Sequence, residues 1–215
     1  MGLKIFYKIS EHVARGTLKV TKQQCIENFL KHFPTKHNHI TFIVEKFTNI
    51  STSWLKTLVN EENIIMNKKM STTDLIKLAI ENCEENDYVY IVEDNYIHKT
   101  NSNLILLEGL FRFDYITLYD HPDKYVNDGT EETNIYLTKN CHWKLTNSTT
   151  MTFAAHVDTL KNDLDIFMKY EGNEFKIFEE LTQNKSKKLA CSIPGYCTKM
   201  VRNGLSPLTD WQKEI

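Results

Sequence analysis

Residues 87–98 read DYVYIVEDNYIH, and this stretch decides the expected fold. Its first part, Tyr88 to Val92, is a short apolar run rich in Val, Ile and Tyr, which is typical of a strand buried on both faces. The run leads directly into Glu93, Asp94 and Asn95. Placing two carboxylates there is costly unless a cation, a partner or a surface cleft receives them. The stretch therefore indicates a candidate site at the end of a buried strand.

The composition indicates one globular domain, either alone or as part of a longer chain. Of the 215 residues, 41% are hydrophobic, which is enough apolar material for a sizeable core. The formal net charge of -2 gives no electrostatic case for binding nucleic acid or an anionic membrane. The five cysteines form no CxxC pair and are typical of reduced thiols in a cytoplasmic protein. No apolar run approaches the ~18 residues of a transmembrane helix.

Strand-like and helix-like segments alternate through residues 3–119. The predicted strands lie at 3–9, 40–44, 63–66, 89–92 and 115–119. The predicted helices lie at 21–33, 53–59, 71–83 and 102–111. Later segments predict strands at 135–138 and 142–145, helices at 157–170 and 174–183, and a less regular tail from 188. The alternation predicts an α/β fold with a mostly parallel central sheet and helices on both faces.

Polar side chains follow four of these predicted strands. They are Lys8 to Ser10, Glu45, Glu93 to Asn95, and Asp120 to Asp123. In open α/β sheets ligands bind beyond the carboxyl ends of the strands, where parallel strands end at one edge. We therefore expect the four polar ends to share one rim of the sheet and to form one site.

The Glu93–Asn95 triplet suits a divalent cation. Mg²⁺ and Mn²⁺ prefer oxygen ligands, usually one or two carboxylates together with substrate phosphates. Acidic residues at a strand end supply half of that coordination shell and leave positions open for a diphosphate. The alternative is a strand-end turn whose acids are solvated or cap the next helix, and the residues alone leave both interpretations open.

Other rim residues offer hydrogen bonds or proton transfer. Glu45 can accept a hydrogen bond from a base or a ribose, or pair with Lys46 at the surface. Within Asp120 to Asp123, either Asp or the histidine can act as a general base or hold an acceptor hydroxyl, whereas the alternative is a proline turn between strands. His142 beside Trp143 pairs an imidazole with a flat face, as carbohydrate sites often do. A core histidine beside a packed tryptophan is the commoner arrangement.

The segment YVYIVEDNYIH resembles the acidic metal-binding signature of GT-A glycosyltransferases, the D-x-D type, here as E-D-N. The segments LKIFYKIS, YITLYDHPDKY, HWKLTNSTTMTFA and SIPGYCTK, with it, resemble a small group of viral and bacterial glycosyltransferases. Within that group the chain resembles the N-terminal glycosyltransferase domain of a large chlorovirus protein that decorates the major capsid protein. The resemblance runs from Leu3 to Trp211, and the joint order of the five segments is more specific than the triplet.

The resemblance implies a single glycosyltransferase domain with a Rossmann-type GT-A fold, which can be the N-terminal part of a longer protein with other domains. A nucleotide-sugar-binding half, up to roughly residue 100, precedes an acceptor-binding half in such folds. The implied reaction moves a hexose or deoxyhexose from a UDP-sugar to a glycan or glycoprotein acceptor, with Mn²⁺ or Mg²⁺. The implied setting is glycosylation of a viral capsid protein in the host-cell cytoplasm. Similarity to retaining GT-A enzymes favours retention of configuration.

On the donor side, the resemblance assigns roles by position. The residues that would line the nucleotide pocket are Lys8, Ile9, Ser10 and Glu45. Asp94, with Glu93 or Asn95, would hold the metal and contact the donor. Asn95 departs from the family, because the last position of such motifs is usually an acidic metal ligand. An amide oxygen coordinates without charge, so we expect the metal to depend more on the phosphates of the donor.

On the acceptor side, the resemblance places five residues near the anomeric carbon or the acceptor. The candidate catalytic residues are Asp120, Asp123 and His142, and the acceptor-side residues are His121 and Trp143. An inverting enzyme needs one carboxylate to take the acceptor proton, for which Asp120 or Asp123 is the candidate. The competing hypothesis is a catalytically silent module that binds nucleotide sugars or glycans. A nucleotidyltransferase is disfavoured, because Gly16 stands alone where a Gly-rich phosphate loop would follow the first strand.

Overall fold

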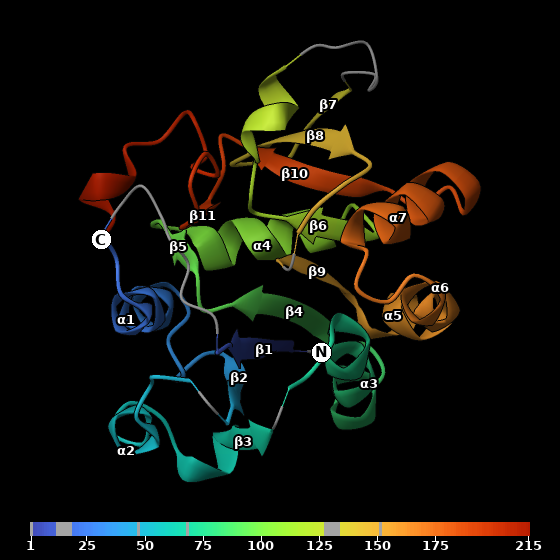
Figure 1. The fold of residues 1–215 in the computed structure, drawn as a ribbon. Coiled ribbons are helices and arrows are strands. Elements are labelled where there is room, and N and C mark those ends of the chain that lie inside the picture. The colour runs from blue at the N-terminus through green and yellow to red at the C-terminus, as the bar shows by residue number, and fades with distance from the viewer. Residues whose placement is uncertain (1, 12–18, 47, 68, 127–133, 151) are drawn as a thin grey trace.

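The fold is built on a nine-stranded sheet, seen in a computed structural model that describes residues 2–11, 19–46, 48–67, 69–126, 134–150 and 152–215. The strand order is β3-β2-β1-β4-β9-β6-β10-β8-β7, and Figure 1 shows these strands stacked from β3 at the bottom to β7 at the top. Their bounds are β1 Leu3–Ile9, β2 His39–Glu45, β3 Ile64–Asn67, β4 Tyr88–Glu93, β6 Tyr115–Thr117, β7 Ile135–Leu137, β8 His142–Thr146, β9 Phe153–His156 and β10 Leu189–Ile193.

The sheet is mostly parallel, as predicted. β1 pairs in parallel with both β2 and β4, and β2 pairs in parallel with β3. β9 runs antiparallel to both β4 and β6, so β6 and its parallel neighbour β10 run in the same direction as β1 to β4. β8 is antiparallel to β10, and β7 is antiparallel to β8. In Figure 1 the arrowheads of β1, β4 and β10 accordingly point to the same side of the molecule.

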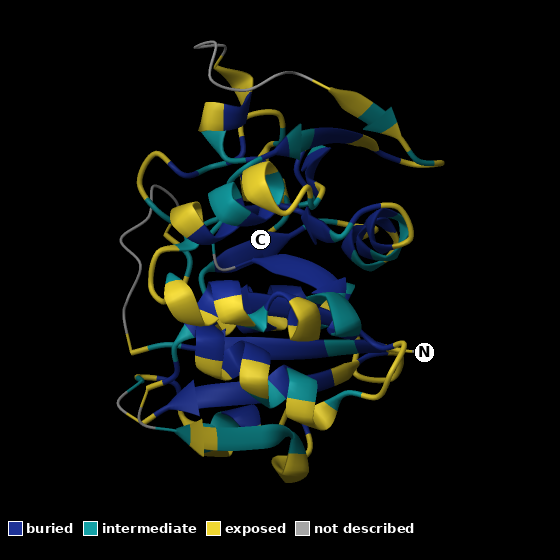
Figure 2. Ribbon diagram, turned by 90° about the vertical axis from the view of Figure 1, so that its right-hand side faces the viewer, coloured by how far each residue is buried: buried dark blue, intermediate teal, exposed yellow. Residues whose placement is uncertain are grey.

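Helices cover both faces of the sheet, because successive strand residues point to opposite faces and both faces are apolar. On β1, Ile5 and Tyr7 belong to one buried cluster, and Phe6 between them belongs to the other. The first cluster includes side chains of α1 (Lys22–His32), α2 (Thr52–Leu55) and α4 (Ser102–Leu110). The second includes side chains of α3 (Thr72–Asn82), α5 (Val157–Asn162), α6 (Leu164–Lys169) and α7 (Glu174–Glu179). Figure 2 shows the strands buried beneath helices whose outer surfaces are exposed.

The predicted stretch 88–93 is a strand of the core. Five of the six residues of β4 are buried, and only Glu93 at its end is partly exposed. Full burial of one large apolar side chain stabilises a fold by about 1.5–3 kcal/mol. β4 lies between β1 and β9 and so joins the strands β3, β2 and β1 to the rest of the sheet. Glu93 and Asp94 stand at the end of this buried strand, which fixes their position.

Several elements differ from the sequence prediction. β5 (Tyr96–His98) and β11 (Cys197–Lys199) form a second, two-stranded sheet that the sequence did not predict. β9 was missed as well, and β10 lies where a less regular tail was expected. The predicted helix at 157–170 divides into α5 and α6 at Asp163. β5, β9 and β11 have only three or four residues each, which is too few to show the alternation of apolar and polar residues that identifies a strand. The remaining short helices are η1 Glu61–Asn63, η2 Pro122–Tyr125, the π-helix Glu180–Asn184 and η4 Trp211–Lys213. Among the described residues, none of the helices has the length and apolarity needed to cross a membrane.

Candidate functional site

Three of the four predicted polar strand ends meet at the C-terminal edge of the sheet. Parallel pairing sets Lys8 opposite Glu93 across β1 and β4. The Lys8 ammonium lies 3.4 Å from an oxygen of Glu45 at the end of β2, and both side chains are largely buried. The backbone N–H of Glu11 donates to the other Glu45 oxygen at 2.8 Å. Ile9 is fully buried in the core, so its side chain does not face the rim.

Asp94 is buried, and its carboxylate is held by two residues, Ser10 and Lys22. Its Oδ2 accepts from the Ser10 backbone N–H at 3.0 Å and lies 2.7 Å from the Lys22 ammonium. The Ser10 hydroxyl donates to Asp94 Oδ1 at 3.2 Å, and the Lys22 ammonium also donates to the backbone oxygen of Ser10. Burial raises the pKa of Asp94, and the nearby Lys22 acts in the opposite direction. The carboxylate therefore ties the start of α1 and the end of β1 to the end of β4.

These contacts engage the carboxylate of Asp94, which the sequence resemblance implied as a metal ligand together with Glu93 or Asn95. Both of its oxygens already accept hydrogen bonds or face an ammonium, and the residue is 1% exposed. A cation at this carboxylate would have to displace Lys22. Sequence reasoning missed Lys22, although a lysine in the first turn of a helix is unusual because the helix dipole disfavours positive charge there. That position was the available signal.

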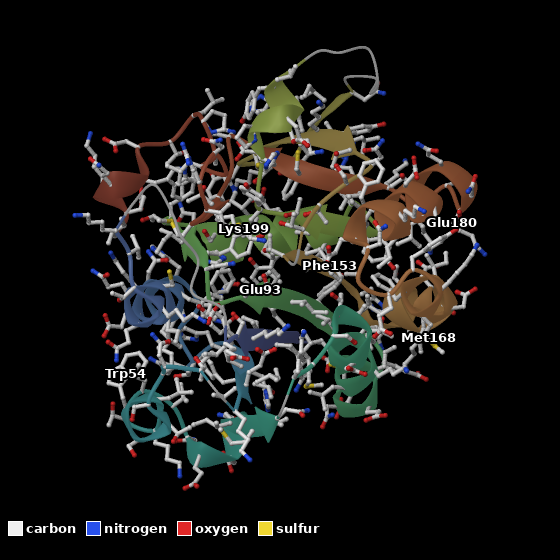
Figure 3. All side chains as sticks on the ribbon, in the orientation of Figure 1. Trp54, Glu93, Phe153, Met168, Glu180 and Lys199 are labelled. Atoms are coloured by element: carbon white, nitrogen blue, oxygen red, sulfur yellow. The ribbon has the colours of Figure 1, made fainter. Side chains whose placement is uncertain are left out.

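Glu93 faces a different lysine, from the tail of the chain. Its carboxylate lies 3.9 Å from the Lys199 ammonium at the end of β11, and Figure 3 shows the two side chains near the centre of the molecule. Burial raises the pKa of Glu93, while Lys199 and Lys8 act to lower it. At 3.9 Å the pair is looser than the pair of Asp94 and Lys22, so Glu93 has more capacity for another partner.

Asn95 has a buried side-chain oxygen that the described part of the chain does not satisfy. Its Oδ1 is buried and has no hydrogen-bond partner among the described residues, whereas its backbone oxygen accepts from Met200 at 2.7 Å. A buried acceptor without a partner is costly. Glu93 and Asn95 together offer a carboxylate and an amide oxygen, which fit Mg²⁺ or Mn²⁺ as part of a shell completed by phosphate. Within the described ranges, no group of three or more His, Cys, Asp and Glu side chains is placed to hold a metal alone.

Asp120, predicted as a candidate catalytic base, is engaged by groups of the chain itself. It is fully buried and accepts a hydrogen bond from the Gly195 backbone N–H at 2.6 Å and another from the Tyr125 hydroxyl. Gly195 is required there, because a Cβ at that position would lie 2.0 Å from Asp120 Oδ1. Burial raises the pKa of Asp120. The carboxylate therefore joins the segment after β10 to the end of β6.

Asp123 and His121, both predicted on the acceptor side, line an accessible pocket. The His121 Nδ1 lies 2.9 Å from Asp123, and the Lys124 ammonium lies 3.6 Å from the same carboxylate. Burial acts to raise the pKa of Asp123, but His121 and Lys124 outweigh it and hold the pKa below its ordinary value. Asp123 is therefore an ionised, partly exposed carboxylate at neutral pH.

His142 and Trp143 do not form a carbohydrate platform. Trp143 is fully buried, and its indole N–H donates to the Thr138 hydroxyl at 3.0 Å. The ring packs so closely on Gly109 of α4 that a Cβ there would lie 2.6 Å from it. His142 is exposed at the start of β8, outside the pocket that contains His121. Strand alternation explains the result, since neighbouring residues of β8 point to opposite faces.

The pocket beside Asp123 has a volume of about 240 Å³ and combines aromatic, acidic and hydroxyl side chains. Its lining residues are Tyr119, His121, Asp123, Lys124, Ser148, Thr149, Thr150, Glu174 and Phe175. Of these, sequence reasoning had named only His121 and Asp123. Two of the others, Tyr119 and Lys124, flank the predicted cluster, and the last five lie far from it in the sequence. They come from the loop before β9 and from the start of α7, and only the strand order brings those segments beside the end of β6. The short sequences STT (148–150) and EF (174–175) match no motif from which a site could be predicted.

No protein-family model and no curated protein matches the sequence. Several solved structures match the fold. GalNAc-T7 with UDP, GalNAc and Mn²⁺ superimposes with a TM-score of 0.61 and 10% identity, over 90% of this chain and 42% of that one. A proposed glucose-1-phosphate thymidylyltransferase from Bacillus anthracis, in complex with a sucrose, has a TM-score of 0.57 and 8% identity, over 99% of this chain and 94% of that one.

The chain has a GT-A-like fold. A third match, a proposed nucleotide-diphospho-sugar transferase from Desulfovibrio desulfuricans G20, has a TM-score of 0.51 and 8% identity, over 89% of this chain and 80% of that one. The chain spans less than half the length of GalNAc-T7. At these identities the likeness concerns the fold, and function has to be argued from the site. In this GT-A-like fold, the charged rim lies where ligands bind in open α/β sheets, beyond the carboxyl ends of the strands.

Proposed function

We propose that the chain is a metal-dependent glycosyltransferase that moves a hexose or deoxyhexose from a UDP-sugar to a glycan or glycoprotein acceptor. The observation that carries the proposal is the rim itself. Buried charged side chains from β1, β2 and β4 gather at the C-terminal edge of a GT-A-like sheet, beside a pocket lined by carboxylates, hydroxyls and aromatic rings. Such a rim can hold a polar, charged donor next to a sugar.

The donor side uses the ends of β1 and β2. The pair Lys8 and Glu45 holds these two strand ends together, and Glu45 also holds the backbone of Glu11. Asp94 fixes Ser10 and Lys22 in the same way. In this proposal, the residues predicted for the nucleotide pocket therefore shape the edge against which the nucleoside lies, and preorganised polar groups lower the cost of binding.

Glu93 and Asn95 are the residues that would hold Mn²⁺ or Mg²⁺. When bound, the cation neutralises negative charge that builds up on the departing diphosphate. The Lys199 ammonium, which lies 3.9 Å from Glu93, supplies further positive charge from this chain at the same place. GalNAc-T7 was crystallised with UDP and Mn²⁺, which supports the choice of nucleotide and metal class.

The acceptor lies on the β6 side of the rim. Asp123 is ionised and reaches the pocket, so it can accept a hydrogen bond from an acceptor hydroxyl or take its proton. The sequence resemblance favours retention at the anomeric carbon, in which case Asp123 positions the hydroxyl. On the same resemblance, we propose a viral capsid glycan as the acceptor and the host-cell cytoplasm as the place of the reaction.

The test is turnover of UDP-hexoses and UDP-deoxyhexoses, assayed with Mn²⁺ or with EDTA. We expect UDP to be released with Mn²⁺, and we expect Glu93→Gln and Asn95→Ala to lower the rate at limiting Mn²⁺. Glu85→Gln, an exposed site away from the rim, is the matched control. Equal rates in EDTA and Mn²⁺ would refute the metal role, and release of pyrophosphate would indicate a nucleotidyltransferase.

A second candidate is a catalytically silent nucleotide-sugar-binding module. It is favoured by one observation, that Asp94 is occupied by Lys22 and Ser10 and that the next residue of the motif is the uncharged Asn95. Calorimetry with UDP-sugars separates the two candidates. Binding without UDP release, across a panel of glycan acceptors, would select the silent module.

A further inference from the structure

The pocket between β6 and α7 has the chemistry of a carbohydrate site. It offers aromatic rings from Tyr119 and Phe175, carboxylates from Asp123 and Glu174, and hydroxyls from the loop 148–150. Resting on the proposed function, we propose that this pocket takes one neutral sugar ring of the acceptor, that Phe175 stacks on that ring, and that Glu174 binds its hydroxyls and excludes anionic sugars.

The size of the pocket fits one sugar ring. Its volume is about 240 Å³, whereas pockets for drug-sized ligands usually have ~300–1,000 Å³. A complete nucleotide sugar exceeds this space, but a single pyranose does not. The pocket is therefore suited to the acceptor and not to the whole donor.

Glu174 is the second carboxylate that lines the pocket, beside Asp123. Asp123 is engaged by His121 at 2.9 Å and by Lys124 at 3.6 Å. Within the described part of the chain, no hydrogen bond or ion pair engages the side chain of Glu174. An ionised carboxylate accepts several hydrogen bonds, and bonds from neighbouring hydroxyls to a charged acceptor are strong. Glu174 is thus placed to bind two hydroxyls of a sugar.

Phe175 supplies an apolar surface at the same pocket. Its side chain is 54% exposed, which is unusual for a large aromatic ring, and it lines the pocket beside Glu174. A sugar presents both hydroxyls and an apolar C–H face. Covering the exposed ring with that face removes apolar area from water, while the hydroxyls reach the carboxylate.

The pocket lies next to the donor side of the rim. The Tyr96 hydroxyl is 2.6 Å from the Thr150 hydroxyl, and the rings of Tyr96 and Tyr119 meet edge to face at 5.6 Å. The Lys199 ammonium lies over the Tyr96 ring at 5.6 Å from its centre. These contacts connect the pocket to Lys199, which faces Glu93. A sugar in the pocket is therefore adjacent to the place proposed for the diphosphate.

The charge of the pocket determines which sugars it admits. The positive charge of Lys124 is balanced by Asp123, and Lys124 also donates to the Ser148 hydroxyl at 2.6 Å. Glu174 is left as an unbalanced negative charge. It repels the carboxylate of a uronic acid, so neutral hexoses are favoured.

The experiment measures binding of methyl glucoside and methyl glucuronide, which differ by one carboxylate, using saturation-transfer NMR and titration on the full chain. We expect the glucoside to bind and the glucuronide to bind at least about tenfold more weakly. Phe175→Ala should weaken glucoside binding. Glu174→Gln should narrow the ratio between the two sugars, because the repulsion is removed. Glu171→Gln and Phe111→Ala, both exposed and outside the pocket, are the matched controls.

A thermal melt of each variant confirms that it is folded. An unchanged sugar ratio in Glu174→Gln, or unchanged affinity in Phe175→Ala, overturns the inference, as does failure of the wild-type chain to bind the neutral sugars of a wider methyl-glycoside panel. UDP-sugar binding by the wild-type chain is measured in parallel. If UDP-sugars bind and methyl glycosides do not, the inference fails and the proposed function stands. If methyl glycosides bind and UDP-sugars do not, the proposed function fails instead.

Discussion

His98 should make the protein sensitive to mild acid. The imidazole is fully buried beneath Phe29 and Phe33, and its Nε2 lies 2.9 Å from the Tyr90 hydroxyl. Its Nδ1 has no hydrogen-bond partner among the described residues. Burial lowers the pKa of His98 from 6.5 to about 3, so the ring is neutral in the folded protein. The unfolded chain, in contrast, takes up a proton below the ordinary pKa.

The size of the effect follows from this difference in pKa. Because the folded pKa is lowered, the contribution of His98 to stability is complete above the unfolded pKa and falls as the pH decreases toward the folded pKa. Each pH unit within that window costs about 1.4 kcal/mol, so the free energy of unfolding decreases by about 2 kcal/mol between about pH 7.5 and pH 5. We expect His98→Gln, which keeps a hydrogen-bonding group for the Tyr90 hydroxyl without a titrating charge, to lose this part of the pH dependence.

Urea unfolding at several pH values, followed by fluorescence of the buried Trp143 and Trp211, measures the difference. The comparison uses the slope of the free energy of unfolding against pH. Loss of packing in His98→Gln lowers that free energy by the same amount at every pH, so it does not change the slope. His142→Gln, the same change at an exposed histidine, is the control and should keep the wild-type slope. Parallel pH profiles for wild type and His98→Gln would contradict the assignment of a neutral, buried imidazole.

Two further predictions concern stability and use urea unfolding. Lys22→Met should cost about 3–5 kcal/mol, because it leaves the buried Asp94 carboxylate without a countercharge, and adding Asp94→Asn should recover most of the loss. If Lys22→Met lowered the free energy of unfolding no more than the same substitution at an exposed lysine, Lys22 and Asp94 would not form this ion pair. Gly195→Ala should cost about 1–3 kcal/mol, because its Cβ would meet Asp120 Oδ1 at 2.0 Å. Gly2→Ala, where the nearest atom lies at 3.6 Å, should have little effect, and equal effects at the two glycines would contradict the packing.

Features set by neighbours in the sequence were predictable. Thr21 and Ser71 begin α1 and α3, and each caps a backbone N–H three residues later. The apolar run before Glu93 forms β4 at nearly the predicted positions. In these cases the physical cause lies within a few residues, so the pattern contains the information. The parallel order of the first strands then followed from their alternation with helices.

Features set by distant partners were not predictable. The place of Lys22 in the first turn of a helix is unusual, but the sequence does not identify it, among 26 Lys and Arg residues, as the partner of Asp94. The burial of Trp143 depends on Gly109, and a glycine inside a predicted helix was the available signal of close packing. Glu174 joins the site only because α7 starts beside the loop before β9. The sequence therefore predicted which polar strand ends come together, but it did not predict which side chains engage them.

The distribution of charge at the end of β4 leads to a last prediction, about metal and nucleotide. Lys22 neutralises Asp94, so the oxygens left for a cation are one carboxylate, Glu93, and the neutral amide of Asn95. One negative charge holds Mn²⁺ weakly, and the diphosphate of the donor has to supply the rest. We therefore expect UDP to strengthen Mn²⁺ binding by about tenfold or more, and Mn²⁺ to strengthen UDP binding by the same factor, because coupling between two ligands is reciprocal.

Titration calorimetry of each ligand in the presence and absence of the other measures this factor. Asn95→Asp adds a second charge, so it should strengthen Mn²⁺ binding without UDP and reduce the coupling. Glu85→Gln, at an exposed position away from the rim, should leave both values unchanged. Equal Mn²⁺ affinities with and without UDP would contradict the shared site. The same result in Asn95→Asp as in the wild-type chain would show that the cation does not contact this residue.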